Sequence, residues 1–140
     1  MYLLDTDHIS LIGRGGAAGE RIIHRMSLID RSKVAISIVT YEELIRGWFA
    51  AIARAKSVGE QRPLYAELNR TLELVCATPI LPFDDAAIAA FQELWLQRLR
   101  VGTMDLKIAS IALTNGATLL TRNISDFSKV PSLQIDDWTL

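Results

Sequence analysis

Four acidic side chains in this sequence lie where an α/β fold collects its chemistry. Asp5 follows a short apolar run, residues 2–4, and Glu43 comes soon after a second such run. Asp105 stands where a helix is expected to begin, and Asp126 follows the last clear strand. The ends of parallel strands and the starts of the helices that follow them lie on one side of a sheet. We therefore expect these four side chains to converge.

Carboxylates gathered at one sheet edge repel one another and are costly to remove from water, unless a cation neutralises them. Oxygen ligands alone favour Mg²⁺ or Mn²⁺ over zinc. His8 and His24 do not have the spacing of zinc ligands, and Cys76 is the only cysteine. The pattern therefore predicts a site for a hard divalent cation, with His8 packing or hydrogen-bonding beside it.

Each acid also has a purely structural interpretation. Asp5 could be a turn or cap residue, and Glu43 could complete a capping box opened by Thr40. Asp105 could be stabilised by a helix macrodipole, and Asp126 could be a loop residue. We favour a shared site because all four fall at the same kind of place in the fold. The remaining acids near expected element ends are interpreted as caps or solvated residues: Glu42, Asp84, Asp85, Asp136 and Asp137.

The elements that must position these side chains alternate between short apolar strands and helices. Strands are expected at residues 2–4, 34–39 and 117–121, with shorter ones within 76–81 and at 134–135. Helices are expected at 20–32, from 40 to about 59, from 63 to 74, at 86–98 and at 106–114. The glycine-rich segment 13–19 and residues 123–127 are expected to be loops. This order predicts one α/β domain over residues 1–140, a three-layer α/β/α sandwich with a mostly parallel central sheet.

Composition excludes several classes of protein. The chain has 140 residues and a net charge of −1, and half of its residues are hydrophobic, which excludes a disordered chain. No apolar run approaches the ~20 residues that a membrane helix needs, no signal peptide is visible, and one cysteine fits a reducing cytoplasm. Arginines are concentrated in the first half, as a basic face or as solvated helix surfaces.

Four motifs, in order, carry a family resemblance: Tyr2-Leu3-Leu4-Asp5-Thr6-Asp7, residues 37–44, Gly102-Thr103-Met104-Asp105 through Ala109, and Leu119-Leu120-Thr121-Arg122-Asn123 through Phe127. With them the chain resembles the PIN-domain ribonucleases, specifically the VapC toxins of bacterial and archaeal toxin–antitoxin pairs. The resemblance covers essentially the whole chain. It implies a PIN-like fold and an endoribonuclease that hydrolyses phosphodiester bonds with the help of a metal ion.

Residue roles follow from the resemblance. It implies that Asp5 and Asp105 are the main metal ligands, that Glu43 rather than Glu42 is the third, and that Asp126 or Asn123 fills the fourth position. It suggests that Thr6 and Thr121 steady water or phosphate and that Arg122 receives the RNA backbone. Two positions depart from the family pattern. Asp7 stands where many relatives have Asn or Ser, and Asn123 stands where many have Asp.

The resemblance also implies partners: Mg²⁺ or Mn²⁺, a structured RNA that is often a tRNA, a cognate VapB-type antitoxin, and a second copy of the chain in a homodimer. Apolar residues of the central helical pair, around Trp48 and Leu64, are interpreted either as a docking surface or as plain core. A catalytically silent PIN-fold module that binds RNA or protein is the alternative. A dehalogenase-like phosphatase would need a lysine after a late strand, whereas Lys107 lies inside an expected helix.

Overall fold

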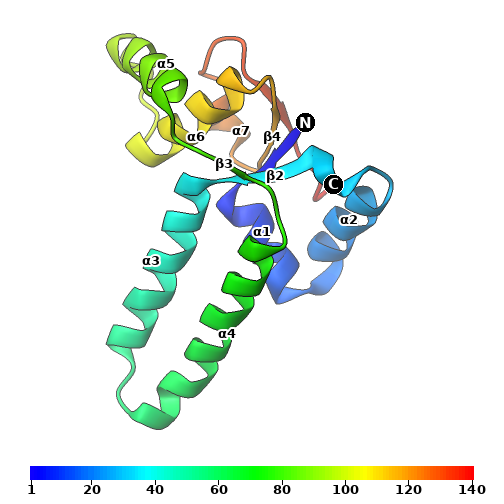
Figure 1. Cartoon of the computed structure of the whole chain (residues 1–140), viewed down its shortest axis with the longest axis vertical. Helices are drawn as coiled ribbons and strands as arrows, with labels where there is room; N and C mark the ends of the chain where they lie inside the picture. Colours follow the sequence, from blue (N-terminus) through cyan, green and yellow to red (C-terminus); the bar gives the residue numbers. More distant parts are fainter.

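The computed structural model describes residues 1–140 and is built around one five-stranded sheet, in which every pair of neighbouring strands is parallel (Figure 1). The strand order is β3-β2-β1-β4-β5. The strands are β1 (Tyr2–Leu4), β2 (Val34–Ser37), β3 (Ile80–Leu81), β4 (Thr118–Leu120) and β5 (Gln134–Asp136). The expected α/β class with a mostly parallel sheet is confirmed. The short strand expected within 76–81 is reduced to two residues, because the preceding helix continues to Cys76.

Seven α-helices connect and cover these strands. They are α1 (Thr6–Arg14), α2 (Gly16–Ser27), α3 (Ile38–Arg54), α4 (Val58–Cys76), α5 (Asp85–Leu96), α6 (Thr103–Thr114) and α7 (Ile124–Phe127). Helices α3 and α4 form the expected antiparallel pair, which extends well beyond the sheet (Figure 1). None of the helices combines the length and the apolar character needed to cross a bilayer.

Successive strand residues point to opposite faces of the sheet and divide the core in two. Leu3 and Leu119 join a cluster with α5, α6 and α7, whereas Leu4 and Leu120 join another with α1, α2 and the ends of α3 and α4. Continuous apolar strands are typical of a parallel sheet that is buried on both faces. This division gives the three layers that the sequence predicts.

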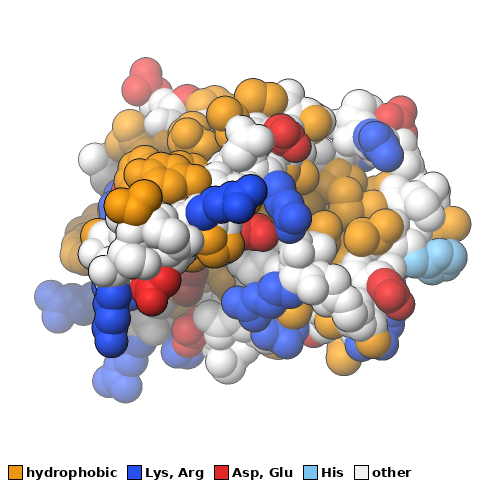
Figure 2. Space-filling view, turned by 90° about the horizontal axis from the view of Figure 1, so that it is seen from below, with side chains coloured by type: hydrophobic (Ala, Val, Ile, Leu, Met, Phe, Trp, Pro, Cys, Tyr) orange, Lys and Arg blue, Asp and Glu red, His pale blue; other side chains and the backbone are white.

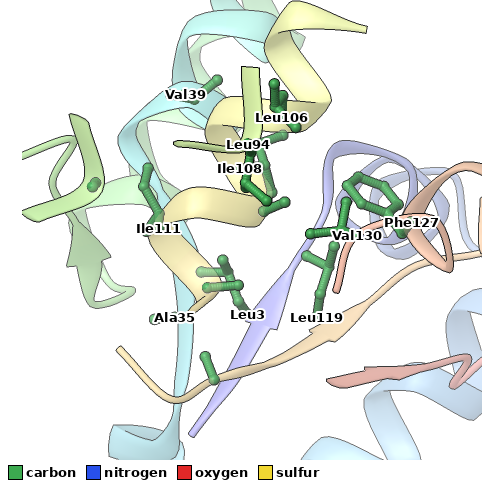
Figure 3. Close-up of a cluster of buried hydrophobic side chains, with 14 residues drawn as sticks. Leu3, Ala35, Val39, Leu94, Leu106, Ile108, Ile111, Leu119, Phe127 and Val130 are labelled. Carbon is green, nitrogen blue, oxygen red and sulfur yellow. The ribbon is translucent and has the colours of Figure 1, made fainter. Parts of the chain in front are cut away.

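Helix α6 is the most deeply buried helix of the first cluster. Its residues Ile108 and Ile111 are almost completely buried and belong to the same cluster as Leu3 and Leu119 on the strands (Figure 3). Such close packing on both sides fixes the rotation of the helix about its axis. The first turn of α6, which carries Asp105, is therefore held at a defined place above the sheet edge.

Two segments that the sequence predicts to be loops are helical, so these two predictions are wrong. The glycine-rich segment 13–19 is mostly helical, with a break only at Gly15 and Gly16, whose φ angles are 72° and 87°. Gly19 lies inside α2, where an added Cβ would come within 2.5 Å of the carbonyl oxygen of Leu11. The glycine there permits close packing of α1 against α2. Residues 124–127 form one turn of helix, α7, rather than a loop.

Replacing Gly19 with alanine is expected to destabilise the protein by about 1–3 kcal/mol, because the new methyl group meets backbone rather than a movable side chain. Gly13→Ala is the matched control: Gly13 is also helical, nothing lies within 4 Å of its added Cβ, and alanine favours helix by up to about 1 kcal/mol. Urea unfolding of both variants measures the difference. Equal midpoints would show that α1 and α2 are not packed as closely as described.

Candidate active site

A small polar pocket of about 170 Å³ opens at the carboxyl ends of β1 and β4. These two strands are neighbours, but the chain runs from β1 outward through β2 and β3 before it returns at β4. Such a switch point is where open α/β sheets bind their ligands. The pocket is lined by Asp5, Thr6, Asp7, Glu43, Asp105, Ile108, Asn123 and Phe127.

Asp5 is held in place by both its backbone and its side chain. Its N–H donates to the carbonyl oxygen of Leu120 at 3.1 Å, which continues the pairing of β1 with β4. Its Oδ1 accepts from the N–H of His8 at 2.8 Å and so caps α1. The structure makes no hydrogen bond to Oδ2 and leaves only 7% of the residue exposed. The predicted cap and the predicted site residue are thus the same side chain.

Glu43 does not take part in a capping box, so that structural interpretation is wrong. The N-cap of helix α3 is Ser37, three residues before the expected cap Thr40, and its hydroxyl oxygen accepts from the N–H of Thr40 at 2.9 Å. Thr40 therefore lies in the first turn, fully buried, and Glu43 lies in the second turn. In a capping box opened by Ser37 the reciprocal position is Thr40, so Glu43 lies three residues too far along, and it lines the pocket instead.

Thr6 holds one oxygen of Glu43 and leaves the other without a partner. The Thr6 hydroxyl donates to Oε2 at 3.2 Å. Glu43 Oε1 is buried and accepts no hydrogen bond. Leaving a buried acceptor unpaired costs about 1–3 kcal/mol, and more for a charged group, unless a cation or a donor satisfies it. This orphaned oxygen and the all-oxygen donor set around it fit a hard divalent cation.

The electrostatics of the pocket also favour a bound cation. Burial raises the pKa of Glu43, and the Asp105 and Asp5 charges raise it further against the opposing hydrogen bond from Thr6. Burial also raises the pKa of Asp105, with additional contributions from the Asp126 and Asp5 charges. The predicted acids are thus close enough to repel one another. In the conformation described, no three His, Cys, Asp or Glu side chains are arranged to hold one ion directly.

Asp126 lies at the rim and is already partnered. Its Oδ2 accepts from the Asn123 amide at 3.1 Å, and its Oδ1 lies 3.2 Å from the Lys129 ammonium group. These two hydrogen bonds lower the pKa of Asp126. Asn123 lines the pocket and Asp126 does not. Lys129 was not identified from the sequence, although its spacing of three residues from Asp126 is the usual signal for an ion pair on a helical turn.

Asp7 and Arg122 form a second feature that no local pattern indicates. The Arg122 guanidinium donates twice to the Asp7 carboxylate, with N···O distances of 2.6 and 3.2 Å. This hydrogen-bonded pair raises the pKa of Arg122, which remains charged. The extra negative charge of Asp7 is therefore balanced at the mouth of the pocket.

The other predicted residues divide between the site and its support. Thr121 does not line the pocket: it is fully buried, and its hydroxyl oxygen accepts from the Asn123 N–H at 3.0 Å, so it shapes the turn rather than contacting water or phosphate. His8 is completely buried next to Asp5, which confirms its expected place beside the site. Glu42 is exposed and pairs with Arg46 on the helix surface, as expected for a solvated residue.

Known proteins resemble this chain over its whole length. The family model described as "PIN domain" matches residues 2–133. "Ribonuclease VapC1" of Haemophilus influenzae strain R2866 is 30% identical over 99% of this chain and 98% of its own length. "tRNA(fMet)-specific endonuclease VapC" of Salmonella typhimurium is 29% identical over 85% of each chain. The crystal structure of DNA-bound VapBC from Salmonella typhimurium covers 98% of this chain and 97% of its own, with 27% identity and a TM-score of 0.76.

Removing one of the repelling charges should stabilise the metal-free protein. The pKa values of Glu43 and Asp105 are raised in the folded state, so ionising these groups lowers the free energy of unfolding. This loss of stability disappears as the pH falls through the raised pKa values to the ordinary carboxylate pKa of about 4. Glu43→Gln and Asp105→Asn are therefore expected to raise Tm at pH 7 in EDTA, with a gain that shrinks on acidification. Glu42→Gln is the exposed control. A lower Tm for both site variants at pH 7 would contradict this electrostatic description.

Proposed function

The chain belongs to the PIN-domain family, and from the acidic pocket at its sheet edge we propose that it is a divalent-metal-dependent endoribonuclease toxin of the VapC kind. The observation that carries the proposal is the buried Glu43 Oε1 with no hydrogen-bond partner, set among Asp5 and Asp105. A fold that needed these acids only as caps would direct each oxygen at a backbone N–H. Oxygen at the pocket with no donor is instead a place for a cation.

The metal ligands that we propose are Asp5, Glu43 and Asp105, with Asn123 or Asp126 at the fourth position. Both oxygens of Asp126 already accept hydrogen bonds, so we infer that it acts through Asn123 or through water. Mg²⁺ keeps several of its waters when it binds to proteins, which fits carboxylates that do not close directly around one point. We propose Mg²⁺ or Mn²⁺ as the ion.

Each side chain has a task in phosphodiester hydrolysis. A bound Mg²⁺ or Mn²⁺ supplies a Lewis acid that activates water and neutralises the scissile phosphate. Thr6 orients the Glu43 carboxylate through its 3.2 Å hydrogen bond. The capping bond from His8 N–H fixes Asp5. Ile108 and Phe127 form the apolar walls that limit the access of other water.

Arg122 is the residue that we propose to bind the RNA backbone. Its half-exposed guanidinium pairs with Asp7 at the mouth of the pocket. We propose that a phosphate oxygen of the RNA accepts hydrogen bonds from this guanidinium, either in place of the Asp7 carboxylate or in addition to it.

We infer a tRNA as the substrate because one relative is named as a tRNA-specific endonuclease. Elsewhere, basic side chains stand beside acidic and hydrophobic ones, as on the face in Figure 2. We therefore expect recognition by shape and by a few backbone contacts rather than by a uniformly basic surface.

Exposed apolar side chains indicate where protein partners bind. Phe49 on α3 is 58% exposed, and it lines a groove with Ile38 and Phe83. Trp95 and Leu96 at the end of α5 are 55% and 80% exposed. Apolar surface of this kind marks interaction sites. We propose that it serves contacts with a cognate VapB-type antitoxin and with a second copy of the chain. Trp48 is partly buried and donates to Thr71 at 2.9 Å, so it belongs to the α3–α4 interface.

Incubation of the purified, antitoxin-free protein with total RNA tests the proposal. We expect discrete cuts that require Mg²⁺ or Mn²⁺ and disappear in EDTA, mapped by sequencing the new 5′ ends. Asp5→Asn should reduce the rate by more than the roughly 100-fold that changes around a metal ligand typically cost. Glu42→Gln, one residue away from Glu43 but exposed, should cut as the wild type does.

Two results would count against the proposal. Cleavage that persists in EDTA would remove the metal ion from the mechanism. Folded protein that cuts no RNA with either ion would favour the alternative, a silent PIN-fold module that binds RNA or protein.

A further inference from the structure

His8 is the one fully buried titratable side chain in the protein that the mechanism above does not use. It lies in the first turn of α1, and its ring stands between the pocket and the C-terminal segment. Its backbone N–H already caps the helix with Asp5. A buried imidazole that served only to fill space would be more costly than an apolar residue of the same size, because its polar nitrogens lose water.

The two ring nitrogens of His8 face opposite partners. Nε2 accepts from the backbone N–H of Trp138 at 3.3 Å, and Asp137 Oδ1 lies further away, at 3.7 Å. A nitrogen that accepts carries no hydrogen, so this hydrogen bond assigns a ring hydrogen to Nδ1. Nδ1 is buried and makes no hydrogen bond. The carboxylate oxygen that it approaches is Asp5 Oδ1, at 3.3 Å, without the geometry of a hydrogen bond. Catalytic contacts of this kind often tighten only when a ligand is bound.

The C-terminal segment is anchored firmly enough to orient the ring. Trp138 is 4% exposed, and its ring packs against Tyr2 with 4.9 Å between centroids. The Trp138 indole N–H donates to Asp136 at 2.9 Å, and Arg21 donates to the carbonyl oxygen of Thr139. The N–H of Thr121 donates to the carbonyl oxygen of Asp136 at 2.9 Å, which ties the segment to the end of β4.

We propose that His8 is a positioning residue: its Nδ1–H donates to Oδ1 of Asp5 when the cation binds, so that Oδ2 is presented to the cation, and the C-terminal segment holds the ring in that tautomer. The inference rests on the proposed function, because it takes Asp5 as a metal ligand. The hydrogen bond from the His8 backbone N–H and the close approach of Nδ1 are both to Oδ1, and no hydrogen bond is made to Oδ2. Groups that hydrogen-bond a metal ligand in this way typically contribute 10–100-fold to metal affinity or activity.

Two substitutions separate the two nitrogens. In His8→Asn the amide nitrogen takes the place of Nδ1 and still donates to Asp5, but the acceptor for Trp138 N–H is lost. In His8→Gln the amide oxygen takes the place of Nε2 and still accepts from Trp138, but the donor to Asp5 is lost. His24, which is exposed on α2, gives the control His24→Gln.

Titration with Mn²⁺, followed by electron paramagnetic resonance, is the main readout, with Tm in EDTA measured alongside. We expect His8→Gln to weaken Mn²⁺ binding by roughly 10–100-fold with a Tm close to that of the wild type. We expect His8→Asn to keep its affinity within a few-fold while its Tm falls. Parallel losses of affinity and Tm in both variants, or an unchanged affinity in His8→Gln, would overturn the proposal.

The wild-type protein provides a check that does not depend on any variant folding. The ¹⁵N shifts of the His8 ring should show the hydrogen on Nδ1, and His24→Gln assigns the signals. A hydrogen on Nε2 would overturn the proposal, because that nitrogen could not accept from Trp138.

A different result would show that the proposed function itself is wrong. If the wild type and Asp5→Asn bind Mn²⁺ equally well, Asp5 is not a metal ligand, and the role proposed for His8 is then wrong as well.

Discussion

Negative charge held partly out of water is the constraint on which the rest of this structure depends. Glu43 and Asp105 are half-buried, and their pKa values are raised first by that burial and then by neighbouring carboxylates. Such a site is relieved either by protons or by a cation. At neutral pH a divalent cation relieves it most fully and also supplies the electrophile that phosphodiester hydrolysis needs. The cost to stability and the chemistry thus have one origin.

The architecture holds these charges apart from the core but close to one another. Asp5 continues β1, Asp105 is carried by the deeply packed α6, and Glu43 stands on a helix that starts directly after β2. The backbone of each residue is therefore fixed by the fold, and side-chain orientation is fixed by the His8 N–H for Asp5 and by the Thr6 hydroxyl for Glu43. Around the rim, Arg122 balances Asp7 and Lys129 balances Asp126. Repulsion is left unbalanced only inside the pocket.

Local patterns in the sequence were sufficient for the parallel sheet and for bringing Asp5, Glu43 and Asp105 to one edge of it, whereas Asp126 lies outside the pocket. They were insufficient where two good candidates compete within a few residues. Ser37 and Thr40 can both cap a helix, and the choice depends on where β2 ends, which packing decides. The helices around Gly15 and Gly16 depend on the close approach of α1 to α2, a tertiary contact. Pairs such as Asp7–Arg122 and His8–Trp138 span more than 100 residues and have no local signal.

The most direct test of the account is the position of the ion itself. Crystals of the protein grown with Mn²⁺ would give an anomalous difference peak wherever the ion binds. We expect a peak in the pocket between the carboxylates of Asp5, Glu43 and Asp105. No peak there, or a peak only at another acidic group such as Asp84 and Asp85 at the start of α5, would contradict it.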